Sequence, residues 1–368
     1  MYEIGYKCMS CRWVSRGTEP RYKCAKCGGA IEVVYDYAKM SDAFISQQFR
    51  HMPPVHMKYY FALPLKRPAR AVTMGEGGTP LIPLSKKLMV KFEGINPTGS
   101  FKDRGSSAEI SKAVELGRDT VVCASTGNMG ASIAAYASAA GIKAVIFTPG
   151  FAEPVKLKQM RYYGADVRTA GETYSEALRA SVECAKGCGA YLTGDYPYRL
   201  EGQKTVAYEI VDQMNFMVPD NIIIPVGNGT LFYATYKAFL EMRRLGIAKR
   251  MPRLIAVQAQ GCRPIVDAVE IGAESVACAE GASTIADAIN CDYPVDGAGV
   301  LTAIRKSGGS AVAVGDEEMI VAKKQLALRG IYAEISSAAA YAAYLKMGEG
   351  LKGRTVVVAT GIGFKDNY

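Results

Sequence analysis

The chain has 368 residues and a mass of 39.5 kDa; 49% of its residues are hydrophobic and 21% are charged. These proportions exclude a disordered chain, a collagen-like fibre and a coiled coil, and they leave room for two domains of ordinary size. The net charge of +9 arises without a long run of basic residues, so no nucleic-acid partner is predicted.

The hydropathy pattern predicts no membrane partner. No apolar stretch reaches the length of about 18 residues that a spanning helix needs, and the N-terminus lacks the apolar core of a secretory signal. We therefore expect a cytoplasmic protein. The only two histidines are His51 and His56, which disfavours Ser-His-Asp and Cys-His catalysis and a His-ligated catalytic zinc. Proton transfers are expected to rest on Lys, Tyr, Asp or Glu.

Residues 1–37 carry the first motif along the chain. Two C-x2-C pairs, separated by twelve residues, contribute the thiols Cys8, Cys11, Cys24 and Cys27. Four cysteines in this pattern predict a zinc ribbon with a closed, structural Zn²⁺ site, whose last strand is Ile31–Tyr35. Disulfides, or a degenerate ribbon without metal, are the alternatives.

Residues 38–72 are a polar connection rich in Pro and Met, and residues 73–368 alternate apolar runs with Ala-rich helical segments. Alternation of this kind predicts an α/β fold in which helices flank a parallel sheet. The predicted strands are 120–124, 144–148, 190–193, 221–226, 253–258 and 355–360. The predicted helices are 104–116, 130–140, 154–163, 173–185, 202–214, 231–245 and 317–328.

Lys102 follows a turn, Asn96-Pro97-Thr98-Gly99, and stands at the start of a predicted helix. The positive end of the helix dipole lowers the pKa of a lysine at such a place. A lowered pKa suits an amine that forms a Schiff base. Taken alone, the segment would favour a solvated surface lysine.

Two further loops each join a predicted strand to a predicted helix. They are Ser125-Thr126-Gly127-Asn128 and Gly227-Asn228-Gly229-Thr230. Free N–H groups at a helix start bind anions, although such loops also serve as ordinary turns. Two anion loops with one lysine suit a ligand that carries a carboxylate, a phosphate and a carbonyl.

With these segments in this order, the chain resembles the fold-type II pyridoxal-phosphate (PLP) enzymes, and among them most closely the threonine synthases. The resemblance also rests on Gly75 to Leu81, Arg199 to Thr205, Glu334 to Ala340 and Thr360 to Asp366. It implies two doubly wound parallel-sheet domains behind the zinc ribbon. A small subdomain of about 97–205 would be inserted in the large one, and the protein would be a homodimer.

The resemblance also implies how the cofactor is held. Lys102 would bind PLP covalently and then move protons on the substrate carbons. Asn128 would hydrogen-bond the phenolic oxygen, and Thr360 would face the pyridine nitrogen. The loop Gly227-Asn228-Gly229-Thr230 would bind the cofactor phosphate.

Other residues would bind the substrate. Ser125, Thr126 and Gly127 would hold its α-carboxylate, while Arg199 and the position of Met129 would contact its phosphate. The chain departs from the family where Met129 replaces a usual Thr, where Thr193 and Gly194 replace Asn-Ser, and where Ile362 replaces His. The phosphate loop is also shorter than usual.

The implied activity is that of a lyase of threonine biosynthesis, which converts O-phospho-L-homoserine and water to L-threonine and phosphate. One alternative is PLP-dependent β-replacement or β-elimination on O-phosphoserine, serine or threonine. Another is a non-catalytic zinc-ribbon protein.

Overall fold

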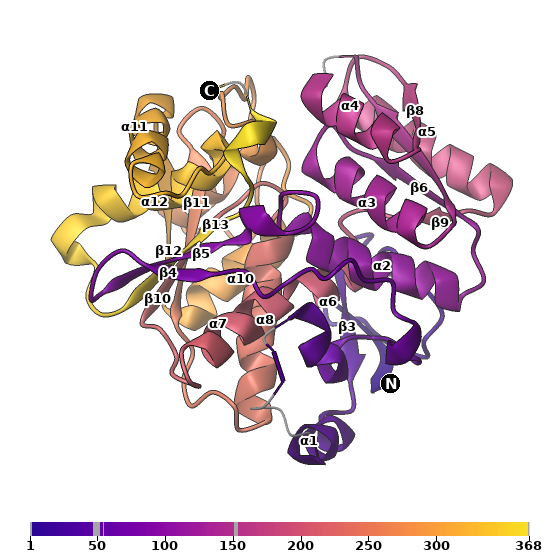
Figure 1. Cartoon of the computed structure of the whole chain (residues 1–368), viewed down its shortest axis with the longest axis horizontal. Helices are drawn as coiled ribbons and strands as arrows, with labels where there is room; N and C mark the ends of the chain where they lie inside the picture. The colour runs from indigo at the N-terminus through magenta and orange to yellow at the C-terminus, as the bar shows by residue number, and fades with distance from the viewer. Residues whose placement is uncertain (1, 47–51, 54, 151–153, 367) are drawn as a thin grey trace.

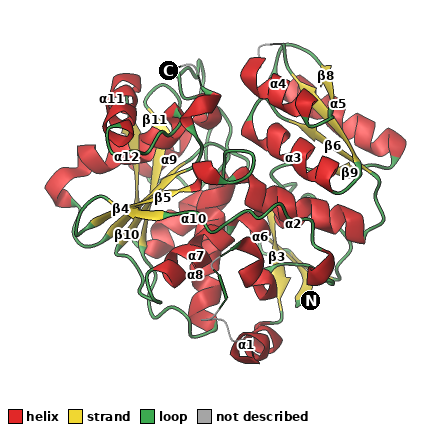
Figure 2. Ribbon diagram, viewed as in Figure 1, coloured by secondary structure: helices red, strands yellow, loops and turns green. Residues whose placement is uncertain are grey.

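The β-branched runs of the sequence build three sheets (Figures 1 and 2). A computed structural model describes the chain apart from residues 1, 47–51, 54, 151–153 and 367. Figure 1 shows two sheet-containing lobes side by side, with the N-terminal ribbon in indigo near α2.

The larger lobe contains a six-stranded sheet in the order β12-β11-β10-β13-β5-β4. Its neighbouring strands are parallel except for the edge pair β4 and β5, which is antiparallel. The strands are β4 (Leu81–Pro83), β5 (Leu88–Phe92), β10 (Asn221–Pro225), β11 (Arg253–Ala259), β12 (Ser310–Val314) and β13 (Thr355–Ala359). The sequence predicted β10, β11 and β13 to within one residue at each end.

The smaller lobe contains a four-stranded parallel sheet in the order β8-β7-β6-β9. The strands are β6 (Thr120–Ala124), β7 (Lys143–Thr148), β8 (Asp166–Thr169) and β9 (Tyr191–Leu192). The sequence analysis missed β8 because its side chains are half-buried or exposed, so it has no apolar run.

Both sheets are covered on both faces, as parallel strands require. In β10, Ile222 and Ile224 join the core that contains α8 and α10, whereas Ile223 joins the core beneath α12. In β6, Val121 packs with α3 and Val122 packs with α5. Successive side chains of a strand point to opposite faces, which explains these continuous apolar runs.

Helices connect the strands. They are α1 (Tyr37–Ser46), α2 (Lys102–Glu115), α3 (Asn128–Ala139), α4 (Pro154–Tyr162), α5 (Tyr174–Cys188), α6 (Pro197–Gln203), α7 (Thr205–Gln213), α8 (Thr230–Arg244), α9 (Pro264–Glu270), α10 (Gly297–Ser307), α11 (Asp316–Ala327) and α12 (Ile335–Met347). The single helix predicted over 202–214 is wrong: α6 and α7 are separate helices that meet at Lys204. Within the described part, each helix is too short or too polar to cross a bilayer.

The ribbon is a three-stranded antiparallel sheet in the order β2-β1-β3, formed by β1 (Glu3–Cys8), β2 (Val14–Arg16) and β3 (Ile31–Tyr35). The segment 38–72, expected to be a polar connection, contains α1 and a 3₁₀ helix over His56–Ala62 whose His56, Tyr59 and Phe61 are buried. The other histidine, His51, lies outside the described residues.

Candidate functional site

The candidate site lies where the carboxyl ends of strands from the two lobes converge. The loop after β6 begins at Ser125, the loop after β10 begins at Val226, and Thr360 follows β13. The N–H of Phe101 donates to the carbonyl of Thr360 at 2.9 Å, which ties the start of α2 to the end of β13. Ligands of open α/β sheets bind at such a junction.

Lys102 is the first residue of α2, as the sequence predicted. Its side chain is 21% exposed, and its Nζ lies 3.9 Å from Oδ1 of Asp195. Burial lowers the pKa of Lys102; Arg199 acts in the same direction, and the carboxylate of Asp195 opposes it. The amine is thus only partly exposed and lies beside the carboxylate of Asp195, which suits a nucleophilic or basic lysine.

The loop of residues 227–230 has the form of an anion cradle. Among the described residues, none of its four backbone N–H groups donates a hydrogen bond. Gly229 has φ +99°, and a Cβ added there would lie 2.5 Å from Cγ2 of Val300. A glycine is required at this position, and the free N–H groups can bind a phosphate.

Asp195 connects this cradle to the lysine. Its carboxylate accepts hydrogen bonds from Nδ2 of Asn228 at 2.7 Å and from Oγ1 of Thr230 at 3.1 Å. Close by, burial raises the pKa of Asp296 to about 7, with Asp195 adding to the shift. Oδ2 of Asp296 is buried and has no hydrogen-bond partner among the described residues.

The loop of residues 125–128 leads into α3. Oγ of Ser125 accepts from the N–H groups of Gly127 at 3.2 Å and Gly130 at 2.8 Å. Within the described residues, the N–H groups of Thr126 and Met129 donate to no protein acceptor. The loop can therefore receive a carboxylate in the way that helix N-termini do.

Lys156 of α4 borders this loop, because a Cβ at Gly127 would lie 3.3 Å from its Cδ. Lys156 forms an ion pair with Asp287, which lies in a 3₁₀ helix of the larger lobe. The pair therefore joins the two lobes at the site.

Asn128 and Thr360 are both buried at the site. Nδ2 of Asn128 donates to Oε1 of Glu334 at 2.9 Å, and Oδ1 of Asn128 accepts from Nζ of Lys365 at 2.9 Å. Oγ1 of Thr360 is 2.9 Å from the hydroxyl of Ser337. Both positions present neutral hydrogen-bonding groups, as the resemblance implies.

Arg199 is fully buried in α6. Its Nη2 donates to Oε2 of Glu109 at 2.6 Å, its Nε donates to the carbonyl of Gly194 at 3.0 Å, and its Nη1 donates to the carbonyl of Lys102 at 3.2 Å. These contacts hold the backbone of Lys102. Contact between Arg199 and a substrate phosphate stays a prediction.

At two of the positions that depart from the family, polar groups form hydrogen bonds to other residues of the protein. The hydroxyl of Thr193 donates to the carbonyl of Val122 at 3.1 Å, and the N–H of Gly194 donates to Oε1 of Glu109 at 3.1 Å. Met129 is buried at the start of α3. The hydroxyl of Thr193 and the N–H of Gly194 are therefore engaged within the protein.

The four predicted metal ligands converge. The sulfur atoms of Cys8, Cys11, Cys24 and Cys27 all lie within 4.8 Å of one another, and none of these residues forms a disulfide. The N–H groups of Ser10 and Cys11 both lie 3.3 Å from the sulfur of Cys8. The disulfide alternative is thus excluded in this structure, and the cluster has the donor set of a structural metal site.

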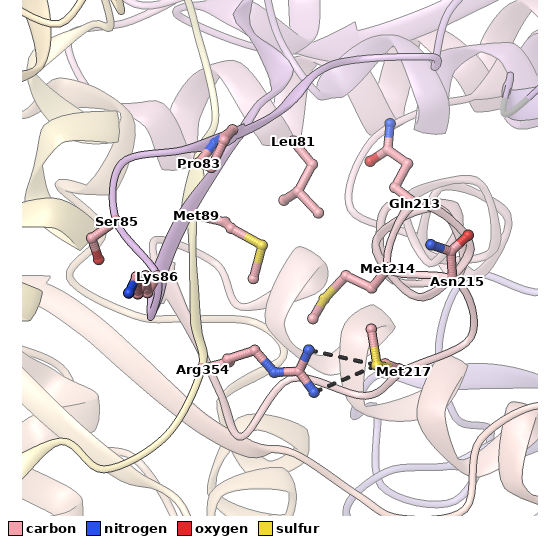
Figure 3. Close-up of a pocket in the computed structure, with 10 residues that line it drawn as sticks. All are labelled: Leu81, Pro83, Ser85, Lys86, Met89, Gln213, Met214, Asn215, Met217 and Arg354. Carbon is pink, nitrogen blue, oxygen red and sulfur yellow. Dashed lines mark hydrogen bonds between the residues drawn. The ribbon is translucent and has the colours of Figure 1, made fainter.

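A pocket of about 460 Å³ lies apart from the candidate site (Figure 3). It is formed at the amino ends of β5 and β13, at the opposite end of the sheet from Thr360. The figure shows Met89, Met214 and Met217 pointing toward Arg354, whose guanidinium contacts the sulfur of Met217.

Sequence reasoning assigned no role to Asp195, Asp296, Glu334 or Lys365. Asp195 stands two residues after the predicted strand 190–193, and this is a signal that could have drawn attention to it. Glu334 and Lys365 stood within the quoted segments, yet their contacts with Asn128 span 206 and 237 residues. No local pattern indicates such contacts.

Comparisons with known proteins agree with this geometry. A family model described as pyridoxal-phosphate dependent enzyme matches residues 72–361. A threonine synthase of Methanosarcina acetivorans is 41% identical over 381 residues, covering 100% of this chain and 93% of the relative. One from Methanocaldococcus jannaschii is 40% identical, covering 98% and 92%.

Solved structures of the same fold include a maize serine racemase, with a TM-score of 0.68 and 24% identity. The match covers 77% of this chain and 88% of that one. A fungal L-serine ammonia-lyase from Rhizomucor miehei has a TM-score of 0.67 and 23% identity, and the match covers 77% and 93%.

Proposed function

We propose that this chain, which belongs to the family of pyridoxal-phosphate-dependent enzymes, is a threonine synthase. It would convert O-phospho-L-homoserine and water to L-threonine and phosphate. The observation that carries the proposal is the similarity to curated threonine synthases over essentially the whole chain. The position of Lys102 beside Asp195, which accepts hydrogen bonds from the loop of residues 227–230, supports it. The activity would make the chain a carbon–oxygen lyase that acts on phosphates.

The residues present fit the cofactor. The unpartnered N–H groups of residues 227–230 and the required glycine at 229 suit a phosphate ester. Lys102 would supply the amine, Asn128 would supply an amide, and the Thr360 hydroxyl would face the pyridine nitrogen. When bound, PLP supplies an electron sink that stabilises negative charge on the substrate carbons.

Each residue would then have a defined task. Lys102, whose pKa burial lowers, would take and return protons at the substrate carbons. The loop of residues 125–128 would orient the substrate through its carboxylate. Arg199 would hold the backbone of Lys102 and contribute to the phosphate subsite.

The test compares phosphate release from O-phospho-L-homoserine and from O-phospho-L-serine, with the Lys102→Ala variant as the inactive control. We expect release from phosphohomoserine only, accompanied by threonine, and a visible absorption band that the variant lacks. Turnover of phosphoserine alone would refute the threonine synthase assignment. A variant that keeps the band would remove Lys102 from its role.

One observation favours β-replacement or β-elimination on phosphoserine as a second candidate. Met129, Thr193 and Gly194 offer no free hydroxyl or amide side chain where the family usually has them. The same paired assay decides between the two activities.

We further propose that Cys8, Cys11, Cys24 and Cys27 hold a structural Zn²⁺. The distances among their sulfur atoms and the backbone N–H groups directed at them support this. Metal analysis of the purified protein tests it, and an absence of zinc would contradict it. A homodimeric state is expected from the resemblance and a cytoplasmic location from the hydropathy pattern; light scattering tests the first and cell fractionation the second.

A further inference from the structure

The side-chain amide of Asn128 is held from both ends by ionisable groups. Nζ of Lys365 donates to Oδ1 at 2.9 Å, and Nδ2 donates to the two oxygens of Glu334 at 2.9 and 3.1 Å. All three residues are buried. They come from α3, from the residue preceding α12 and from the turn after β13, so only the folded chain brings them together.

The chemistry of these partners fixes the orientation of the amide. An ammonium group only donates hydrogen bonds, and an ionised carboxylate only accepts them. A flipped amide would place its NH2 group against Lys365 and its oxygen against Glu334, and every contact would be lost. Because the amide nitrogen carries two hydrogens, one can serve Glu334 while the other serves a ligand.

We propose that Lys365 is a positioning residue that makes Asn128 a hydrogen-bond donor toward the phenolic oxygen of PLP. The inference rests on the proposed function, because the resemblance assigns that oxygen to Asn128. Lys365 acts through Asn128: it holds the amide oxygen and thereby directs the N–H groups into the site.

The surrounding backbone leaves little room for another arrangement. A Cβ at Gly99, where φ is +88°, would lie 3.1 Å from Cε of Lys365. A Cβ at Gly361 would lie 2.3 Å from Oε1 of Glu334. The side chains of Lys365 and Glu334 therefore each pass close to a glycine, where an added side chain would crowd them.

The charge on Lys365 is sensitive to pH. Burial lowers its pKa to about 8; Glu334 and Asp103 oppose the shift, and Lys156 of α4 adds to it. Above this pH the group is a neutral amine, which can accept as well as donate. Glu334 alone then specifies the orientation of the amide, so the absorption of bound cofactor should change through about pH 8.

The test uses Lys365→Met, with Lys346→Met as the matched control. Lys346 forms a surface ion pair with Glu318 at 3.1 Å and is 45% exposed. In Lys365→Met we expect a shifted visible band, no spectral change near pH 8, and a kcat lower by about 10- to 100-fold with a smaller effect on KM. Asn128→Ala should shift the band likewise, and the double variant should shift it no further.

Several outcomes would overturn the inference. One is a Lys365→Met protein that keeps the visible band and the pH response of the parent. Another is a double variant whose band shift equals the sum of the shifts in Lys365→Met and Asn128→Ala. If Lys365→Met does not fold, the visible band of the parent is followed against pH and compared with that of Lys365→Arg, which keeps a cation. A parent band that does not change near pH 8 would contradict the role of Lys365, whereas a parent with no visible band would contradict the proposed function itself.

Discussion

The guanidinium of Arg199 contacts acceptors of the protein itself, so its substitution should affect stability as well as substrate binding. In Arg199→Ala, the carboxylate of Glu109 would stay buried without its cation, and we expect a loss of about 3–5 kcal/mol in unfolding free energy. Urea denaturation measures this loss.

A double variant separates the two roles. Replacing both charges, in Arg199→Met with Glu109→Gln, removes the unpaired charge and should recover most of the stability. If Arg199 also contacts the substrate phosphate, KM for the phosphorylated substrate stays raised in the double variant. A parental KM would limit Arg199 to a structural role.

His56 gives the protein a pH-dependent stability. Burial lowers its pKa from 6.5 to about 4, so the folded chain holds it neutral; Nδ1 lies 2.9 Å from Oγ1 of Thr205. Because the unfolded chain binds the proton first, this stability is complete above about pH 6.5 and is lost as the pH falls toward 4. The loss amounts to about 3 kcal/mol, since one pKa unit corresponds to roughly 1.4 kcal/mol.

The measurement is urea unfolding at several pH values between 4 and 7, for the parent and for His56→Gln. The variant should be less stable at pH 7, and its unfolding free energy should fall less between pH 7 and pH 4 than that of the parent. Equal slopes for the two proteins would mean that His56 is protonated in the folded chain.

At the scale of elements, α2 packs closely against α6. A Cβ at Gly202 would lie 2.1 Å from the carbonyl oxygen of Arg104, so only glycine allows the two backbones to approach. Two residues before Arg104, Lys102 begins α2. A shift of this helix would therefore move the lysine.

We expect Gly202→Ala to cost about 1–3 kcal/mol, or more, through overpacking and to weaken the cofactor band. The matched control is Gly187→Ala in α5, where an added Cβ meets nothing within 4 Å. That variant should be more stable by about 0.5–1 kcal/mol, because alanine favours helix. Thermal unfolding and the visible spectrum compare the two, and equal effects would contradict the close-packing explanation.

The sequence predicted elements well where the local pattern was strong. Strand β6 matches its prediction fully, because a buried parallel strand reads as an apolar run. The edge strand β4 has three half-buried or exposed residues and gave no such signal. The junction of α6 and α7 was missed because Lys204 keeps helical backbone angles, φ −61° and ψ −18°, so no helix-breaking residue stands there.

In the candidate site, too, the sequence predicted the residues that carry a local signal and missed those that do not. Lys102 and the two glycine loops carry local signals, because helix starts and turns demand particular residues. The partners of these residues carry none. Asp195 is recognised as a neighbour of Thr230 only once β9 and β10 are placed, and Lys365 meets Asn128 only when the C-terminal turn closes on α3.

At the scale of the whole molecule, the ribbon rests on the helices that position the site. Glu3 of β1 pairs with Lys112 of α2 at 3.1 Å, and Tyr35 of β3 donates to Glu201 of α6 at 2.8 Å. These contacts come from strands, whereas Cys11, Cys24 and Cys27 lie outside the strands and Cys8 is the last residue of β1. Loss of metal should therefore loosen the turns first and leave the strands docked.

A chelator should accordingly lower the temperature of the first unfolding transition while the visible band stays intact below it. The metal contributes about 4 kcal/mol where free Zn²⁺ exceeds its Kd a thousandfold. Cys11→Ser should behave like the chelated protein, and Cys188→Ser, an exposed cysteine outside the cluster, like the parent. A band that bleaches in step with metal loss would show instead that α2 and α6 depend on the metal, and that ribbon and site unfold as one unit.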